Sequence, residues 1–170
     1  VFMVVGLGSD GNFYIINMVR DRLNLTERTN TLLNLHRRYA PIGVGWEKYG
    51  KDSDIEHIQY EQAEQNYRFH ITPLGGKTSK PDRIKMLIPK FEQGMVFLPD
   101  RCNYVTYEGI ARDMTKDFVN DEYLEFPLPV HEDMLDCLAR ILDPKFPTKF
   151  PKRRSRADVE DGYLDPKIVS

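Results

Sequence analysis

Short runs of β-branched and aromatic residues alternate along this 170-residue chain with longer segments in which apolar residues recur at helical spacing. The alternation follows an opening hairpin, in which residues 1–6 and 13–19 flank the turn formers Gly8-Ser9-Asp10-Gly11-Asn12. Strands that alternate with helices favour a sheet covered by helices over an all-helical or all-β arrangement. We therefore predict an α/β fold.

The other elements follow from the same two patterns. Predicted helices cover residues 25–39, 54–65, 81–93, 110–124 and 131–142. Predicted strands cover residues 41–46, 67–72, 95–98 and 102–107. Because prolines and a run of basic residues follow Leu142, we predict one domain over residues 1–143 and an irregular tail, first basic and then acidic, over residues 144–170.

Composition and charge limit the classes of function. The formal net charge is only -2, so a nucleic-acid partner would have to meet a local basic surface. Cys102 and Cys137 lie far apart without a C-x-x-C motif, which argues against a zinc ribbon or a disulfide framework and fits a cytosolic setting. No P-loop occurs, and no apolar run reaches the roughly 20 residues that span a bilayer.

Two motifs have partial matches that we reject. Residues 6–11 match G-x-G-x-x-G, but a strand-like segment follows where a dinucleotide site needs a helix N-terminus, so a hairpin turn is the better interpretation. His131-Glu132 begins like the zinc motif H-E-x-x-H, but Leu135 stands where the second histidine is required.

Two acidic positions stand out as candidate metal ligands. Glu47 directly follows the apolar strand 42–46, and functional groups collect at the carboxyl ends of strands in α/β sheets. Asp133 and His131 begin the helix at 131–142, where carboxylates suit Mg²⁺ or Mn²⁺ and imidazole suits Mn²⁺. The alternatives are an ordinary loop glutamate at position 47 and, for Glu132 and Asp133, charges that favour the helix dipole.

The order of these segments resembles the nuclease domains of phage and prophage large terminase subunits. The resemblance covers residues 1–142 and rests on an ordered set of short motifs: the hairpin, Gly45-Trp46-Glu47-Lys48-Tyr49-Gly50, Ile71-Thr72-Pro73-Leu74-Gly75-Gly76, residues 80–94, Met95-Val96-Phe97-Leu98-Pro99, Glu125-Phe126-Pro127, and residues 131–139 in place of the family's H-D-D-x-x-D-A. Each motif is short, so their shared order carries the resemblance.

The resemblance implies a ribonuclease H-like mixed sheet flanked by helices and a metal-dependent endonuclease. Such an enzyme cuts concatemeric double-stranded DNA during genome packaging, with two Mg²⁺ or Mn²⁺ ions at its site. The family's second and third acidic ligands map onto Glu47 and Asp133, with His131 beside them and Glu132 and Asp136 as weaker candidates. The implied partners are an ATPase motor domain, the portal and the small terminase subunit, in the host cytoplasm and away from membranes.

Two departures from the family pattern are visible. Glu132 replaces the middle aspartate of H-D-D, a mild change between two carboxylates. The family's first metal-binding aspartate lies on a central strand ahead of the hairpin, whereas this chain opens at Val1 within an apolar run. We therefore expect a piece of a longer protein whose sheet lacks its first central strand, leaves two neighbouring edges unpaired and is incomplete as an enzyme.

DNA phosphates would meet the basic residues around the Gly75-Gly76 turn, namely Lys77, Lys80, Arg83 and Lys85. An ordinary solvated loop is an equally good interpretation, and Arg83 has the alternative of pairing with a core carboxylate. Two other functions stay open: another ribonuclease H-like nuclease such as a resolvase, and a non-catalytic module that binds DNA or a packaging partner.

Overall fold

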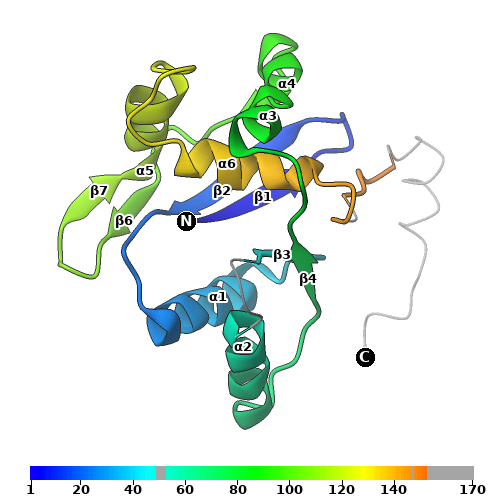
Figure 1. Ribbon diagram of the computed structural model, residues 1–170, viewed down its shortest axis with the longest axis vertical. Coiled ribbons are helices and arrows are strands. Elements are labelled where there is room, and N and C mark those ends of the chain that lie inside the picture. The colour runs from blue at the N-terminus through cyan, green and yellow to red at the C-terminus, as the bar shows by residue number, and fades with distance from the viewer. Residues whose placement is uncertain (49–52, 147, 153–170) are drawn as a thin grey trace, which may run out of the picture.

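The computed structural model describes residues 1–48, 53–146 and 148–152, and the predicted α/β class is confirmed (Figure 1). Tyr49, Gly50 and most of the predicted tail lie outside the described residues. The strands are β1 (Phe2–Leu7), β2 (Phe13–Val19), β3 (Val44–Glu47), β4 (Ile71–Leu74), β5 (Val96–Phe97), β6 (Asn103–Val105) and β7 (Ala111–Asp113).

Six α-helices accompany these strands among the described residues: α1 (Leu25–Tyr39), α2 (Ser53–Glu64), α3 (Lys80–Lys85), α4 (Ile88–Glu92), α5 (Met114–Asp117) and α6 (Asp133–Ala139). A π-helix, η1 (Phe118–Tyr123), continues α5, and a 3-10 turn, η2 (Arg140–Leu142), continues α6. Among the described residues, no helix combines the length and the apolar character needed to cross a membrane.

The described strands form three separate small sheets. In the first, β1 pairs antiparallel with β2, and β5 adds parallel to β2. In the second, β3 and β4 are parallel, and in the third β6 and β7 are antiparallel. Consequently β1 and β3 are both edge strands, and the ring of Phe2 lies 5.8 Å from that of Trp46 across the space between their sheets.

Local polar contacts explain the opening hairpin. The Asp10 carboxylate accepts hydrogen bonds from the Asn12 backbone N–H and the Tyr14 hydroxyl, and these bonds lower the pKa of Asp10. Gly11 has a φ of 85°, a conformation that glycine adopts without steric cost. The glycine-rich segment is therefore a turn between two strands, as predicted.

Helix α1 begins where its sequence indicates. The Asn24 side chain accepts from the Glu27 backbone N–H and the Glu27 side chain accepts from the Asn24 N–H, which makes a reciprocal capping box. Leu32 and Leu33 are buried on the apolar face, and Ala40 ends the helix in a left-handed conformation. The bounds match the predicted helix.

Two predicted helices were wrong in their continuity. The helix predicted over residues 81–93 is divided into α3 and α4, because Pro89 has no backbone N–H with which to continue α3 and the intervening amides of Met86 and Leu87 bond three residues back. The helix predicted over 110–124 starts late. Residues 111–113 form β7 instead, and the Asp113 side chain caps α5 by accepting from the Thr115 N–H.

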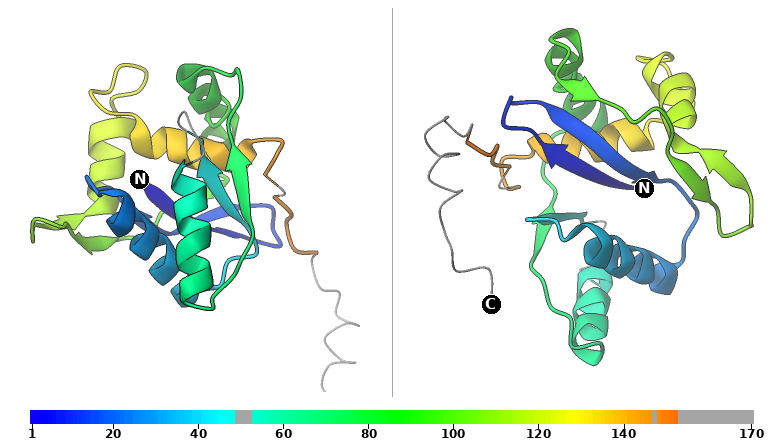
Figure 2. Two further views of the ribbon diagram at one scale, coloured as in Figure 1. Left: turned by 60° about the horizontal axis from the view of Figure 1, so that its bottom comes forward. Right: turned by 180° about the vertical axis from the view of Figure 1, so that it is seen from behind.

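Two apolar cores lie on either side of the space between β1 and β3. The larger core packs α6 against the β1–β2 hairpin, α3 and η1, with Met18, Met114, Phe118 and Met134 fully buried. The smaller core joins α1 and α2 to β3 and β4. Figures 1 and 2 show these two halves, with α6 lying across the hairpin and α1 and α2 on the opposite side of the molecule.

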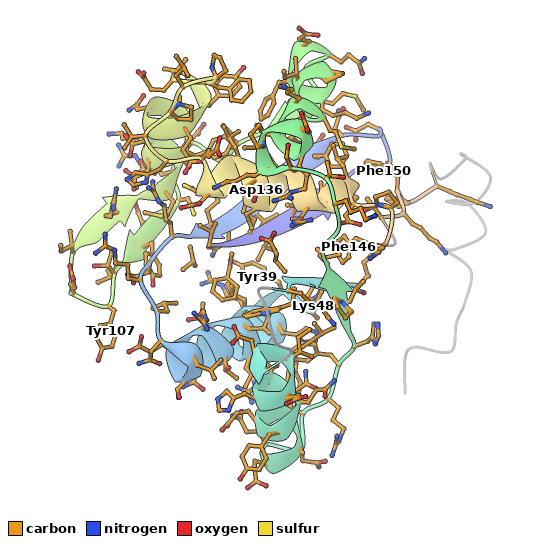
Figure 3. The ribbon with its side chains drawn as sticks, viewed as in Figure 1. Tyr39, Lys48, Tyr107, Asp136, Phe146 and Phe150 are labelled. Carbon is orange, nitrogen blue, oxygen red and sulfur yellow. The ribbon has the colours of Figure 1, made fainter. Side chains whose placement is uncertain are left out.

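The chain after η2 packs back onto the folded part. The Phe146 ring lies 3.4 Å from the positions that a Cβ atom would take at Gly43 and Gly45, so these glycines let the ring approach β3 closely. Phe150 meets Phe13 edge to face, with ring centroids 5.1 Å apart. Figure 3 shows both rings on the same side of the molecule.

Candidate functional site

Helix α3 lies against the first two turns of α6, and two ion pairs join them. The Lys80 ammonium donates to Asp133 Oδ1 at 2.7 Å. One turn further along both helices, the Arg83 guanidinium donates to both oxygens of Asp136, at 2.9 and 2.8 Å. The 80/83 and 133/136 spacings place each pair of side chains on one helix face, so the two ion pairs lie one turn apart along the contact between α3 and α6.

Glu47 joins this network from the second sheet. It ends β3, where pairing with β4 sets it beside Leu74, and its carboxylate accepts a hydrogen bond from Arg140 Nη2. Arg83 Nη2 lies 3.5 Å from the same Glu47 oxygen, so Arg83 links Glu47 to Asp136. The end of β3 and α6 are therefore connected through Arg83, which contacts Glu47 and Asp136.

The carboxylates of this network differ in their access to solvent. The Asp133 side chain is 57% exposed, and the hydrogen bond from Lys80 lowers its pKa. The Asp136 side chain is only 6% exposed and is held by a bidentate arginine. Asp133 is thus accessible to an external cation, whereas Asp136 is placed to stabilise the crossing of α3 and α6.

Sequence reasoning missed the residue that holds the N-terminus of α6. The fully buried Glu122 carboxylate, on the π-helix η1, accepts from the backbone N–H groups of Met134 and Leu135. Arg20 Nη1 lies 3.8 Å from this carboxylate. Glu132, at the N-cap position, makes no side-chain capping bond. The available signal was the spacing of Glu122 one turn after Phe118, on the apolar face of its helix.

The other predicted site residues differ in their contacts with the network. His131 is exposed, and across the described ranges no hydrogen bond or ion pair joins it to the acidic residues. Lys77 is also exposed, and Lys85 pairs with Asp82 at 3.4 Å. Glu132 lies near Lys80, at 3.9 Å. Of the four basic candidates, Lys80 and Arg83 therefore contact carboxylates of α6, and Arg83 adopts the carboxylate-pairing alternative. Lys85 contacts Asp82 of its own helix, and Lys77 is exposed.

The donor chemistry suits a hard divalent cation, but the described side chains do not complete a site. Glu47, Glu132, Asp133 and Asp136 offer the carboxylate oxygens that Mg²⁺ and Mn²⁺ prefer. Within the described ranges, however, no three His, Cys, Asp or Glu side chains come close enough to hold one ion. The positive charges next to these carboxylates come from Lys80, Arg83 and Arg140.

Comparison with protein-family models, with curated proteins and with solved structures found no match for this chain. A functional assignment therefore depends on the arrangement of its own residues and on the ordered motifs of its sequence.

Proposed function

We propose that this chain is a ribonuclease H-like nuclease domain of the large-terminase type, a divalent-metal-dependent endonuclease that cuts double-stranded DNA. One observation carries the proposal. Glu47 at the carboxyl end of β3 and Asp136 of α6, far apart in the sequence, are joined through Arg83, and Arg140 also contacts Glu47. Asp133 lies one turn before Asp136 and pairs with Lys80. Carboxylates from distant segments are what a two-ion phosphodiesterase site requires.

The separation of the sheets supports the same proposal. All six residues of β1 are only partly buried, although Phe2, Met3, Val4 and Val5 form an apolar run typical of an internal strand. β1 and β3 are both edge strands, with Phe2 against Trp46 between them. We propose that one further strand pairs with these two edges and completes a ribonuclease H-like sheet, in which it would carry the first metal-binding aspartate.

This added aspartate would meet the need for a further donor beside Glu47 and Asp133. Metal ions bound there would activate water for attack on a phosphodiester and stabilise the leaving oxygen. Lys80, which pairs with Asp133, would also contact DNA. Its ammonium is partly exposed beside Asp133, so on DNA it would exchange this carboxylate for a phosphate oxygen and leave Asp133 to the cation. Lys77 and Lys85 would add phosphate contacts from the solvent side.

Cleavage of supercoiled plasmid in Mg²⁺ or Mn²⁺ tests the proposal, with this chain compared to a version that carries about 30 further upstream residues, enough for a strand and its turns. We expect nicking and linearisation by the longer version, and loss of both in Asp133→Asn and in Glu47→Gln. Glu125→Gln is the matched control, because its side chain is exposed and lies outside the charged network. Equal activity of Asp133→Asn and the parent protein would refute the assigned site.

A second function has its own supporting observation. Every carboxylate of the network has a lysine or arginine partner, as in ion pairs whose role is structural. This favours a non-catalytic module that binds DNA through Lys77, Lys80 and Lys85. On this alternative, Asp133→Asn leaves DNA affinity unchanged or higher in a filter-binding or anisotropy titration, and no cleavage occurs in either metal with either length of chain.

A further inference from the structure

An apolar groove lies on the side of α3 and α6 that does not carry the charged network. Its volume is about 270 Å³, and its walls include Ile84, Leu87, Phe91, Tyr123, Phe126 and Leu135. One wall is formed by α3 and α4, the other by η1 and the segment after it, and Leu135 of α6 contributes to the lining. Figure 1 shows α4 and the helix that continues α5 standing on either side above α6.

The segment that supplies Tyr123 and Phe126 to the groove also carries exposed apolar side chains. Leu124, Leu128 and Val130, in the segment that follows η1, are 65%, 86% and 90% exposed. Isolated exposed apolar residues are common on soluble proteins, but several within seven positions beside an apolar groove indicate a binding surface. The groove volume lies just below the range of about 300–1,000 Å³ that is usual for small-molecule sites, so it fits a few side chains of a larger partner.

The charges around the groove indicate the charge that a binding partner would carry. Residues 117–133, which include the η1 wall, contain six Asp or Glu residues and no Lys or Arg. Asp121 and Glu125 are exposed in the segment that supplies Tyr123 and Phe126 to the groove, and Arg20 lies 3.9 Å from Asp121. The exposed Glu92 lines the opposite wall. Lys90 of α4 does not line the groove and lies instead at a second hollow, with Phe13 and Ile141. Carboxylates on both walls of an apolar groove complement an apolar segment with basic flanks.

We propose that this groove binds one amphipathic α-helix of a partner protein, with an apolar face in the groove and Lys or Arg residues along its flanks. A helix presents apolar anchors at i, i+3 or i+4, and i+7, which suits an apolar groove between two helical walls. The surface is distinct from the nuclease site and binds without metal or DNA. It shares α3 and α6 with that site, so its occupant would contact the same two helices that carry Lys80, Arg83 and Asp133.

Two labelled synthetic peptides of about 16 residues, roughly four helical turns, provide the probes. Both carry leucines along one face, but one has lysines on its flanks and the other glutamates. In fluorescence-anisotropy titrations we expect the lysine peptide to bind about tenfold more tightly, since three exposed charge pairs each contribute a small amount. The difference is expected to shrink in high salt.

Three variants decide the outcome. Glu92→Lys/Asp121→Lys/Glu125→Lys reverses the order of the two peptides, and Leu128→Ser/Val130→Ser weakens the lysine peptide without changing the circular dichroism spectrum. Ile42→Ser is the control, because Ile42 is 89% exposed outside the groove. Equal affinities for both peptides, binding by neither, or an unchanged preference in the triple variant would overturn the proposal. Loss of plasmid cleavage in Asp133→Asn bears only on the nuclease site and leaves this result unaffected.

Discussion

The ion pair between Arg83 and Asp136 is expected to stabilise the fold, and removal of one partner is expected to be costly. The Asp136 side chain is 6% exposed, and Arg83 donates to both of its oxygens, at 2.9 and 2.8 Å. Arg83→Met keeps the apolar stem but leaves the buried carboxylate without a cation. Loss of one partner from a buried pair lowers the free energy of unfolding by about 3–5 kcal/mol.

A matched pair on the same two helices supplies the control. Lys80 and Asp133 meet one turn earlier, but their side chains are 31% and 57% exposed. Water already solvates these charges, so Lys80→Met is expected to cost no more than about 1 kcal/mol. The two substitutions thus remove similar salt bridges between α3 and α6 that differ mainly in burial.

Urea unfolding followed by fluorescence of the single tryptophan, Trp46, measures both variants. With a urea dependence of about 2 kcal/mol per molar, Arg83→Met lowers the midpoint by roughly 1.5–2.5 M and Lys80→Met by about 0.5 M or less. Arg83 also donates to the Thr78 carbonyl, so a double-mutant cycle with Asp136→Leu isolates the pair, with an expected coupling of about 2 kcal/mol or more. Equal midpoints for Arg83→Met and Lys80→Met, or an additive cycle, would refute the reasoning.

Three further predictions concern one buried and two partly buried groups. Glu122→Gln weakens the hydrogen bonds to two backbone amides of α6 and is expected to lower the free energy of unfolding by about 2 kcal/mol. The control is Asp121→Asn, at a side chain that is 48% exposed, which is expected to change the free energy of unfolding by no more than about 0.5 kcal/mol. Burial lowers the pKa of His36 below 6.5, so the folded state binds fewer protons than the unfolded state. In unfolding scans the free energy of unfolding is therefore expected to decrease as the pH falls below 6.5. This decrease is expected to be smaller in His36→Gln. Burial, together with the hydrogen bond to Asp21, raises the pKa of Tyr104 to about 12. The unfolded state therefore loses this proton at a lower pH than the folded state, so the free energy of unfolding is expected to decrease between pH 10 and 12. The decrease is expected to be smaller in Tyr104→Phe.

Much of the secondary structure could be predicted because it depends on contacts within a few residues. The capping box at Asn24 and the glycine turn at Gly11 are local, and both occur where the sequence places them. The division between α3 and α4 was missed because the apolar spacing of Ile84, Leu87 and Phe91 continues across Pro89, although the backbone bonds do not. Periodicity reports which face is buried and does not report whether the helix is continuous.

The candidate site could be predicted only in part. Glu47 and Asp133 were identified from their positions at a strand end and a helix start, and both lie in or beside the charged network. Sequence patterns did not identify Lys80 and Arg140 as ion-pair partners of these carboxylates. For Arg83, pairing with a carboxylate was one of two stated alternatives. Whether a lysine or arginine faces a carboxylate or solvent depends on packing between segments that are distant in the chain, and single-sequence patterns do not contain this information.

The sequence by itself determined the α/β class, the opening hairpin, the extent of α1 and the acidic positions at the end of β3 and the start of α6. Only the tertiary structure decided that Arg83 links Glu47 with Asp136, that Glu122 holds the N-terminus of α6, and that β1 and β3 belong to separate sheets. The physical reason is the separation along the chain of the residues that interact. Turns, caps and amphipathic faces form between near neighbours, whereas buried ion pairs and strand edges depend on how whole elements come together.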